Sequence, residues 1–214
     1  EFEIYGYSIN EVEDDVTKKF IKSFDVFRNL SKLSDEIANK TIRQDNLDIL
    51  IDLMGYTPGS RMGILSSRAA PIQINYLAYP STTGSDQIDY ILSDENVIPI
   101  DKQECFSEKV IYLPKTFICF NDSTQIAKNL REDPFQKLDP NFSVLLAFHR
   151  VEKMNPQTLD CWIDVMHKYI DSYLWVKETN QLAKYNLQSY FKSKNIDLSR
   201  IVYAKRENLY ADHL

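Results

Sequence analysis

The chain has 214 residues, of which 43% are hydrophobic and 26% are charged, and its formal net charge is −6. This composition supports a packed core and excludes collagen-like, low-complexity and wholly disordered proteins. The negative charge argues against nucleic acid as the main partner, because phosphate binding depends on clustered Lys and Arg. The longest apolar runs are far shorter than the roughly twenty residues that a membrane span requires, so no span is expected.

Cysteine and histidine usage argues against a metal site. Cys105, Cys119 and Cys161 are widely spaced, no C-x-x-C pair occurs, and the chain has three histidines. A zinc site is therefore not expected, and the odd number of cysteines predicts reduced, structural thiols in a cytoplasmic protein. No signal peptide is visible, but the chain begins with Glu1 instead of Met, which indicates a fragment or a processed start.

The first half alternates between predicted strands and helices. A helix is expected from Asp14 or Asp15, because Val16, Phe20 and Phe24 recur at helical spacing. A second helix begins at Ser34, a residue type that caps helices. A third, short helix is expected over residues 61–69. The predicted strands cover residues 2–9, 47–55, 72–80 and 88–94, and the segment 108–117 closes this half. The near-continuous apolar run of residues 47–55 is typical of a buried parallel strand.

The second half repeats the alternation after a polar segment, residues 121–141, which is the best candidate for a linker. Strands are expected over 142–148, 172–178 and 200–204, with helices from Pro156 and over 180–195. The apolar faces of these two helices are predicted to contain Leu159, Ile163, Val165 or Met166, and Leu182, Tyr185, Leu187 and Phe191. The alternation indicates an α/β protein. No repeat of 20–50 residues occurs, so the segment is not a solenoid.

The glycines are unevenly distributed. Four of the five, Gly55, Gly59, Gly63 and Gly84, lie within one thirty-residue stretch, which predicts unusual backbone there because glycine adopts positive φ without steric cost. The run DLMGYTPGSRMG follows a predicted strand and precedes a predicted helix. That context suits ligand binding at a helix N-terminus, but a tight turn explains it equally well. It matches neither the G-x-G-x-x-G nor the P-loop pattern.

Two further segments offer candidate chemistry. The hydroxyls of Thr82 and Thr83 follow a predicted strand and can donate to a sugar or a phosphate, or they belong to an ordinary polar loop. His149, Arg150 and Lys153 lie between a predicted strand and the next helix. A lysine there suits a pyrophosphate, and a solvated basic turn is the alternative. The spacing indicates no Ser-His-Asp, Cys-His or paired-carboxylate arrangement.

Five ordered elements in the first half are more specific. They are G-Y-T-x-G-x-R (55–61), R-x-A-P-I-Q (68–73), Y-P-x-T-x-G (79–84), D-Y-I-x-x-D (89–94) and S-E-K-x-x-Y-L-P (107–114). In this order they resemble the catalytic region of the O-linked N-acetylglucosamine transferases, a family that includes the SPINDLY-type proteins. The second half is more loosely similar, through AFHRVEKMNPQTLDCWIDVM and LYADHL.

The resemblance implies an α/β fold of the GT-B type, with two Rossmann-like lobes facing across a cleft, both incomplete in this chain. Residues 1–120 would form the N-terminal lobe without its first strand and histidine loop. Residues 121–141 would be the linker, and residues 142–214 would be the first half of the donor-binding lobe.

The resemblance also implies a function, namely inverting transfer of a sugar from a nucleotide donor, usually UDP-GlcNAc, to Ser or Thr hydroxyls of proteins. No metal or other cofactor is implied. The full-length protein would carry N-terminal tetratricopeptide repeats and act in the cytoplasm, whereas the fragment alone would be inactive. The alternatives are a non-catalytic GT-B-like binding module, or a related transferase that uses GDP-fucose or an asparagine or non-protein acceptor.

Individual positions match the family pattern to different degrees. By resemblance Lys153 contacts the donor diphosphate and His213 packs beside the uracil. The other implied donor residues are Arg150, Leu77, Ala78 and Pro80, and the acceptor-side loop contains Gly55, Thr57, Arg68, Thr82 and Thr83, with Tyr56 as a second catalytic candidate. Arg150, His149 and Ala78 replace the Gln, Asn and Gly that are usual in the family, so the nucleotide and sugar preference stays open.

Overall fold

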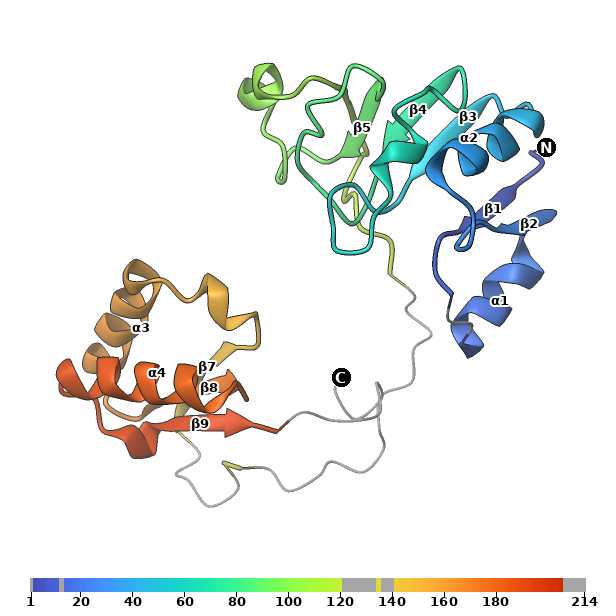
Figure 1. The fold of residues 1–214 in the computed structure, drawn as a ribbon. Coiled ribbons are helices and arrows are strands. Elements are labelled where there is room, and N and C mark those ends of the chain that lie inside the picture. The colour runs from blue at the N-terminus through green and yellow to red at the C-terminus, as the bar shows by residue number, and fades with distance from the viewer. Residues whose placement is uncertain (1, 12–13, 121–133, 136–140, 206–214) are drawn as a thin grey trace. The chain divides into compact units, whose positions relative to one another are not determined.

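The computed structural model describes residues 2–11, 14–120, 134–135 and 141–205 (Figure 1). Its contacts divide the chain into two compact units, Glu1–Phe120 (unit 1) and Asn121–Leu214 (unit 2). The expected linker over 121–141 lies almost wholly outside the described residues and stays a prediction.

Unit 1 contains two parallel sheets. In the first, β1 (Tyr5–Ser8) pairs with β2 (Val26–Asn29). In the second, β3 (Ile49–Asp52), β4 (Ile72–Asn75), β5 (Tyr90–Ser93) and β6 (Lys109–Tyr112) follow one another in chain order. The predicted strands are confirmed with shorter bounds, whereas β2 was not predicted. Parallel pairing brings the carboxyl ends of neighbouring strands to the same edge of a sheet.

Two α-helices accompany these strands. In α1 (Asp15–Ser23) the carboxylate of Asp14 accepts from the Thr17 N–H, and in α2 (Asp35–Gln44) the hydroxyl of Ser34 accepts from the Ile37 N–H, so both predicted starts are confirmed. Residues from α2, β3 and the connecting segments before α2, after β3 and before β5 form a core cluster, which contains Leu30, Ala38, Ile42, Leu50, Ile64, Leu65, Ala69, Ala70 and Ile88. By contrast, α1 buries none of its side chains.

Two expectations for unit 1 are wrong. Residues 61–69 contain a single 3₁₀ turn, Met62–Ile64, instead of a helix. The chain cannot continue as a helix there because Arg68 adopts a left-handed φ of 46°. The strand β3 is also not buried on both faces, since Ile49 and Ile51 are 49% and 45% exposed while Leu50 packs into the core.

Unit 2 has one parallel sheet of β7 (Ser143–Ala147), β8 (Ser172–Lys177) and β9 (Ile201–Ala204), in that order. The helices α3 (Pro156–Lys168) and α4 (Gln181–Ser193) pack against it. The side chains of Asn155 and Asn180 cap them, and Pro156 stands at the start of α3 as predicted. All five elements therefore match the expected alternation.

The predicted apolar face is correct for α3 and half wrong for α4. In α3, Leu159, Ile163 and Met166 are buried. In α4, Leu187 and Phe191 are buried, but Leu182 and Tyr185 are 70% and 68% exposed. Nine positions separate Leu182 from Phe191, so they lie about 180° apart on a helix of 3.6 residues per turn. The four residues therefore never shared one face.

The three cysteines are unpaired, as expected for reduced thiols, and all three are exposed. Within the described ranges, no helix has both the length and the apolar character needed to cross a membrane.

Candidate functional site

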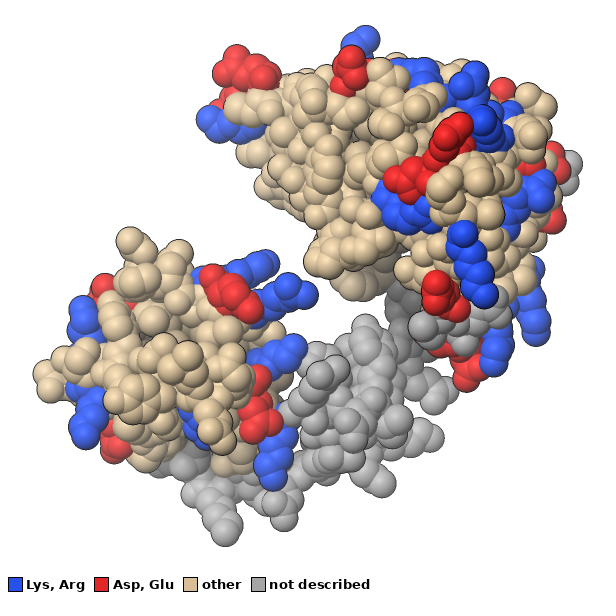
Figure 2. Space-filling model, viewed as in Figure 1, with Lys and Arg blue, Asp and Glu red and all other residues tan. Residues whose placement is uncertain are grey.

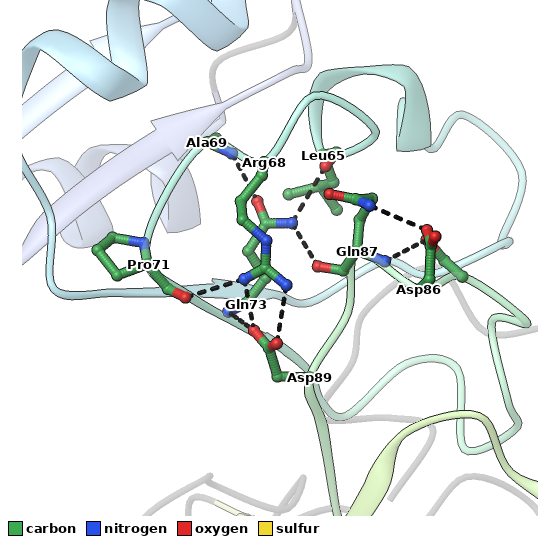
Figure 3. A network of polar contacts seen from close by, with 9 residues as sticks. Leu65, Arg68, Ala69, Pro71, Gln73, Asp86, Gln87 and Asp89 are labelled. Carbon is green, nitrogen blue, oxygen red and sulfur yellow. Dashed lines mark hydrogen bonds and ion pairs between the residues drawn. The ribbon is translucent and has the colours of Figure 1, made fainter.

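The most specific sequence motifs of unit 1 meet in a polar network at the amino ends of β4 and β5 (Figure 3). The guanidinium of Arg68 donates to both carboxylate oxygens of Asp89 at 2.9 and 2.8 Å, and to the Pro71 carbonyl at 2.9 Å. Asp89 also accepts from the Gln73 N–H at 2.8 Å. The guanidinium and this backbone bond hold the pKa of Asp89 below its ordinary value.

The side chain of Gln73 completes this network. It is fully buried, and its oxygen accepts from the Ala69 N–H at 2.9 Å. Its nitrogen donates to the carbonyls of Leu65 and Gln87 at 3.1 and 2.7 Å. The amide therefore joins the turn before β4 to the loop before β5. The R-x-A-P-I-Q and D-Y-I-x-x-D elements therefore hold the backbone at the amino ends of β4 and β5 together. The polar groups of Arg68, Gln73 and Asp89 are already engaged in hydrogen bonds within the protein.

Thr82 and Thr83 are also engaged within the protein. Thr82 donates to Glu108 at 2.8 Å, and the Thr83 N–H donates to the same carboxylate at 2.7 Å, with a further bond from the Thr83 hydroxyl. Burial acts to raise the pKa of Glu108, but these hydrogen bonds outweigh it and lower the pKa. Glu108 immediately precedes β6, so the loop after β4 is fixed to the amino end of another strand.

The carboxyl ends of β3 and β4 are shaped by a close backbone approach. The carboxylate of Asp52 accepts from the N–H groups of Met54 and Gly55 at 3.0 and 2.8 Å. Gly55 has a φ of 54°, and a Cβ there would collide with the Cβ of Tyr79. Glycine is therefore required at this position for two reasons, its backbone conformation and the contact with Tyr79. The predicted positive φ is also found at Gly59 and Gly84, but not at Gly63.

Exposed aromatic and apolar groups line this edge. The ring of Tyr56 is 53% exposed and lies edge-on to the ring of Tyr79, with 5.7 Å between centroids. The Thr57 hydroxyl donates to the Met54 carbonyl at 2.8 Å. Ala78 and Pro80 are exposed in the following loop. Two neighbouring loops at the carboxyl edge therefore contain six of the candidate residues, as the sequence predicts, namely Gly55, Tyr56, Thr57, Leu77, Ala78 and Pro80. Arg68, by contrast, belongs to the network at the amino edge.

In unit 2, the candidate residues follow β7 at the carboxyl edge of its sheet. Ala147, Val176 and Tyr203 form one row across the three strands, which defines this edge. The segment after β7 contains a 3₁₀ turn, Val151–Lys153, and leads directly into α3. Ligands of open parallel sheets bind outside the carboxyl ends of the strands, so the segment has the expected location for a binding loop.

The cations of this segment have no partners in the described part of the chain. Arg150 and Lys153 are exposed, and neither side chain makes a hydrogen bond or ion pair with another described residue. His149 is half-buried, and its ring lies 5.6 Å from that of Trp162. His213, the remaining donor candidate, lies outside the described residues.

Two other lysines lie near the same edge and were not predicted. Lys177 ends β8, and the amine of Lys184 in the first turn of α4 lies 4.5 Å from the ring centroid of Tyr203. On the face that Figure 2 shows, Lys and Arg side chains are interspersed with Asp and Glu on both units. The cations at the carboxyl edge of the unit 2 sheet are therefore not part of a larger basic patch on this face. In the sequence, Lys177 lies near the end of the strand predicted over 172–178 and Lys184 lies within the helix predicted over 180–195, so spacing alone did not single out either lysine.

The described residues contain no group of three or more His, Cys, Asp or Glu side chains that could hold a metal ion.

Comparisons with known proteins agree with the resemblance seen in the sequence. The model of glycosyl transferase family 41 matches residues 1–139. A probable UDP-N-acetylglucosamine–peptide N-acetylglucosaminyltransferase SEC of Arabidopsis thaliana is 28% identical over 94% of this chain and 21% of its own length. A Caenorhabditis elegans UDP-N-acetylglucosamine–peptide N-acetylglucosaminyltransferase is 36% identical over 60% of this chain and 11% of its own length. The chain spans about a fifth or less of the length of these curated relatives.

A solved structure shows the fold. A mutant of Thermobaculum terrenum O-GlcNAc transferase matches 99% of this chain and 40% of that chain, with a TM-score of 0.87 at 23% identity. The α/β, GT-B-like fold class that the sequence predicts is therefore confirmed.

Proposed function

Because the chain belongs to glycosyl transferase family 41, we propose that it is part of an enzyme that transfers a sugar from a nucleoside-diphosphate donor to Ser or Thr hydroxyls of proteins. UDP-GlcNAc is the first donor to test, since the relatives are named for it. The observation that supports this function best is a pair of exposed cations, Arg150 and Lys153, that have no partner among the described residues and lie between the carboxyl end of β7 and the start of α3.

The proposed reaction depends on stabilising the negative charge of the leaving diphosphate and involves no covalent intermediate with the enzyme. The acceptor hydroxyl oxygen forms a bond to C1 of the sugar, and the bond from C1 to the diphosphate oxygen breaks with inversion. The nucleoside diphosphate leaves with the electron pair, and the hydroxyl proton is released to water. Lys153 stabilises the negative charge that develops on the leaving oxygen, and the positive end of the α3 dipole adds to this effect.

The candidate residues of unit 1 divide into three roles under this proposal. Tyr56 and Thr57 belong to the acceptor side, and the loop of Leu77, Ala78 and Pro80 lies toward the sugar. Arg68, Thr82 and Thr83, which the sequence also places on the acceptor side, are assigned to the scaffold, because Asp89 and Glu108 occupy their polar groups.

The remaining properties of the whole protein follow from the same proposal. It takes protein or peptide acceptors, needs no metal and has no nucleic-acid partner. It acts in the cytoplasm, and tetratricopeptide repeats recruit its substrates.

Donor binding and transfer test the proposal in the full-length protein. Calorimetric titration with UDP and GDP should show saturable binding of UDP, and mass analysis of acceptor proteins should show addition of GlcNAc from UDP-GlcNAc. Parallel incubations with UDP-glucose and GDP-fucose identify a different donor. A protein that binds neither nucleotide and modifies no acceptor is instead a non-catalytic binding module.

A further inference from the structure

Asn75 is a buried polar side chain that no motif of the sequence singled out. It is the last residue of β4 and has no exposed surface. Its amide nitrogen donates to the carbonyls of Tyr79 and Ser81 at 3.0 and 3.3 Å. Its amide oxygen is buried and has no hydrogen-bond partner among the described residues.

An unpaired buried acceptor is unfavourable, and a leucine of similar size would avoid it. The amide therefore contributes through its two donated bonds alone. Both bonds reach across the turn that leaves β4, which consists of residues 76–81 and is called the β4 turn below. The two hydrogen bonds join the end of β4, where the β4 turn starts, to residues near the end of the turn.

The β4 turn contains strained backbone that requires such support. Leu77 has a φ of 77°, a left-handed value that a leucine rarely adopts. The Ala78 N–H donates to the Tyr76 carbonyl at 3.2 Å across Leu77. A bond between residues two apart around a φ near +75° describes the rare, strained form of the γ-turn. Strained backbone persists only where its surroundings hold it, and it clusters at functional sites.

Other contacts also hold the turn from outside. The Tyr76 hydroxyl donates to the Phe117 carbonyl at 2.7 Å. The absence of a side chain at Gly55 lets Tyr79 approach the loop after β3, where its ring meets that of Tyr56. These contacts fix the two tyrosines, but among the described residues the Asn75 amide is the side-chain group that bonds both the Tyr79 and the Ser81 carbonyls.

We propose that Asn75 is a positioning residue that holds the β4 turn in its strained conformation through the carbonyls of Tyr79 and Ser81. The inference rests on the proposed function, in which this turn lies toward the sugar of the donor. Asn75 does not touch the donor, and it acts by fixing the backbone of Leu77 and Ala78. Its loss should therefore impair the chemical step more than donor binding, because a misplaced sugar still binds through its nucleotide.

The test compares Asn75→Leu with Asn39→Leu in the full-length protein. Asn39 is a matched control, because it is 5% exposed and donates its amide to a backbone carbonyl, that of Ile64, at 2.7 Å, away from the β4 turn. Three quantities are measured for each variant, namely the Tm, the hydrogen–deuterium exchange of amides 76–82, and the kcat and donor KM of transfer.

Both variants should lower the Tm. Asn75→Leu alone should speed exchange of amides 76–82, and it should lower kcat about tenfold or more with less than a threefold change in donor KM. Two results would overturn the proposal. One is that the amides of the β4 turn exchange equally fast in Asn75→Leu and Asn39→Leu. The other is that the two variants have equal kcat when compared at the same folded fraction. If the wild-type protein transfers no sugar, the proposed function fails, whereas the exchange comparison still decides whether Asn75 holds the turn.

Discussion

The candidate segments of the two units use their charged side chains in opposite ways. In unit 1, Arg68 and Asp89 form a two-bond ion pair, and Glu108 accepts hydrogen bonds from Thr82 and Thr83. In unit 2, Arg150 and Lys153 are exposed, without partners among the described residues. Charges that are already paired stabilise a fold, while unpaired cations remain available to an anionic ligand. Two of the strong sequence motifs, R-x-A-P-I-Q and D-Y-I-x-x-D, therefore mark structural demands, whereas the two cations that fit the proposed chemistry best lie in a weaker motif.

The largest expected effect is on activity, at Lys153. Lys153→Ala in the full-length protein should lower kcat/KM by roughly 10²-fold or more, because it removes a charge that stabilises the leaving group. The Tm should not change, since the Lys153 side chain has no partner among the residues that the structure describes. Lys192→Ala is the control, because Lys192 is exposed at the end of α4. An unchanged kcat/KM in Lys153→Ala would remove the contrast between the units.

Arg68 should show the reverse pattern. Arg68→Met should destabilise unit 1 by about 1–2 kcal/mol, less than for a fully buried pair because the Arg68 and Asp89 side chains are 36% and 30% exposed. Both tryptophans, Trp162 and Trp175, lie in unit 2, so their fluorescence reports that unit alone. The urea concentration at the midpoint of unfolding should fall for unit 1, as followed by hydrogen exchange of its amides. The midpoint for unit 2, as followed by tryptophan fluorescence, should not change.

Arg43→Met serves as the control for Arg68→Met, because Arg43 is exposed on α2 and makes no side-chain ion pair with another described residue. Equal destabilisation by both substitutions would show that the network of Figure 3 contributes nothing specific.

Acid should destabilise unit 1 through the same groups. The pKa values of Asp89 and Glu108 are lowered in the folded protein. A lowered folded pKa gives stability that is complete above the unfolded values, about 3.9 for Asp and 4.3 for Glu, and that is lost as the pH falls through the folded values. Asp89→Asn should therefore be less stable than wild type at pH 7, and the difference should narrow below about pH 4. Parallel curves of unfolding free energy between pH 7 and pH 3 would contradict this.

The smallest expected effect concerns a helix end in unit 2. Asn195 follows α4 with a left-handed φ of 60°, and the Ile196 N–H donates to the Phe191 carbonyl at 3.1 Å, which is a Schellman-type end. Asn195→Ala should destabilise unit 2 by about 0.5–1 kcal/mol, since alanine disfavours this conformation. Asn195→Gly should be neutral or slightly stabilising. Unfolding of unit 2 followed by tryptophan fluorescence measures the stability of both variants. Equal destabilisation by Asn195→Ala and Asn195→Gly would show that the left-handed backbone of Asn195 is not the cause.

Local chemistry made much of the fold predictable. Asp14, Ser34 and Pro156 marked helix starts, and apolar runs marked most strands, because these signals act within a few residues. The strand β2 was missed because its four residues, Val26–Asn29, include two exposed positions and carry no clear alternation. The helix expected over 61–69 failed because the backbone of Arg68 adopts a left-handed φ of 46°, which the spacing of apolar residues does not reveal.

The candidate site was predictable only in part. The position of Lys153 beyond a strand and before a helix could be recognised from spacing alone. The engagement of Thr82 and Thr83 could not, because their partner Glu108 lies some 25 positions away in sequence. The role inferred for Asn75 also escaped detection, since it depends on the direction in which two carbonyl groups point.

The exposed thiols noted in the fold have a practical consequence. With Cys119→Ser, unit 1 retains Cys105 at the end of a 3₁₀ helix and unit 2 retains Cys161 on α3, so each unit presents one reactive attachment point. A maleimide-linked spin label or a donor–acceptor dye pair could then be attached without introducing a new cysteine. The distance distribution between the two labels, recorded with and without UDP, would report directly whether nucleotide binding draws the units together.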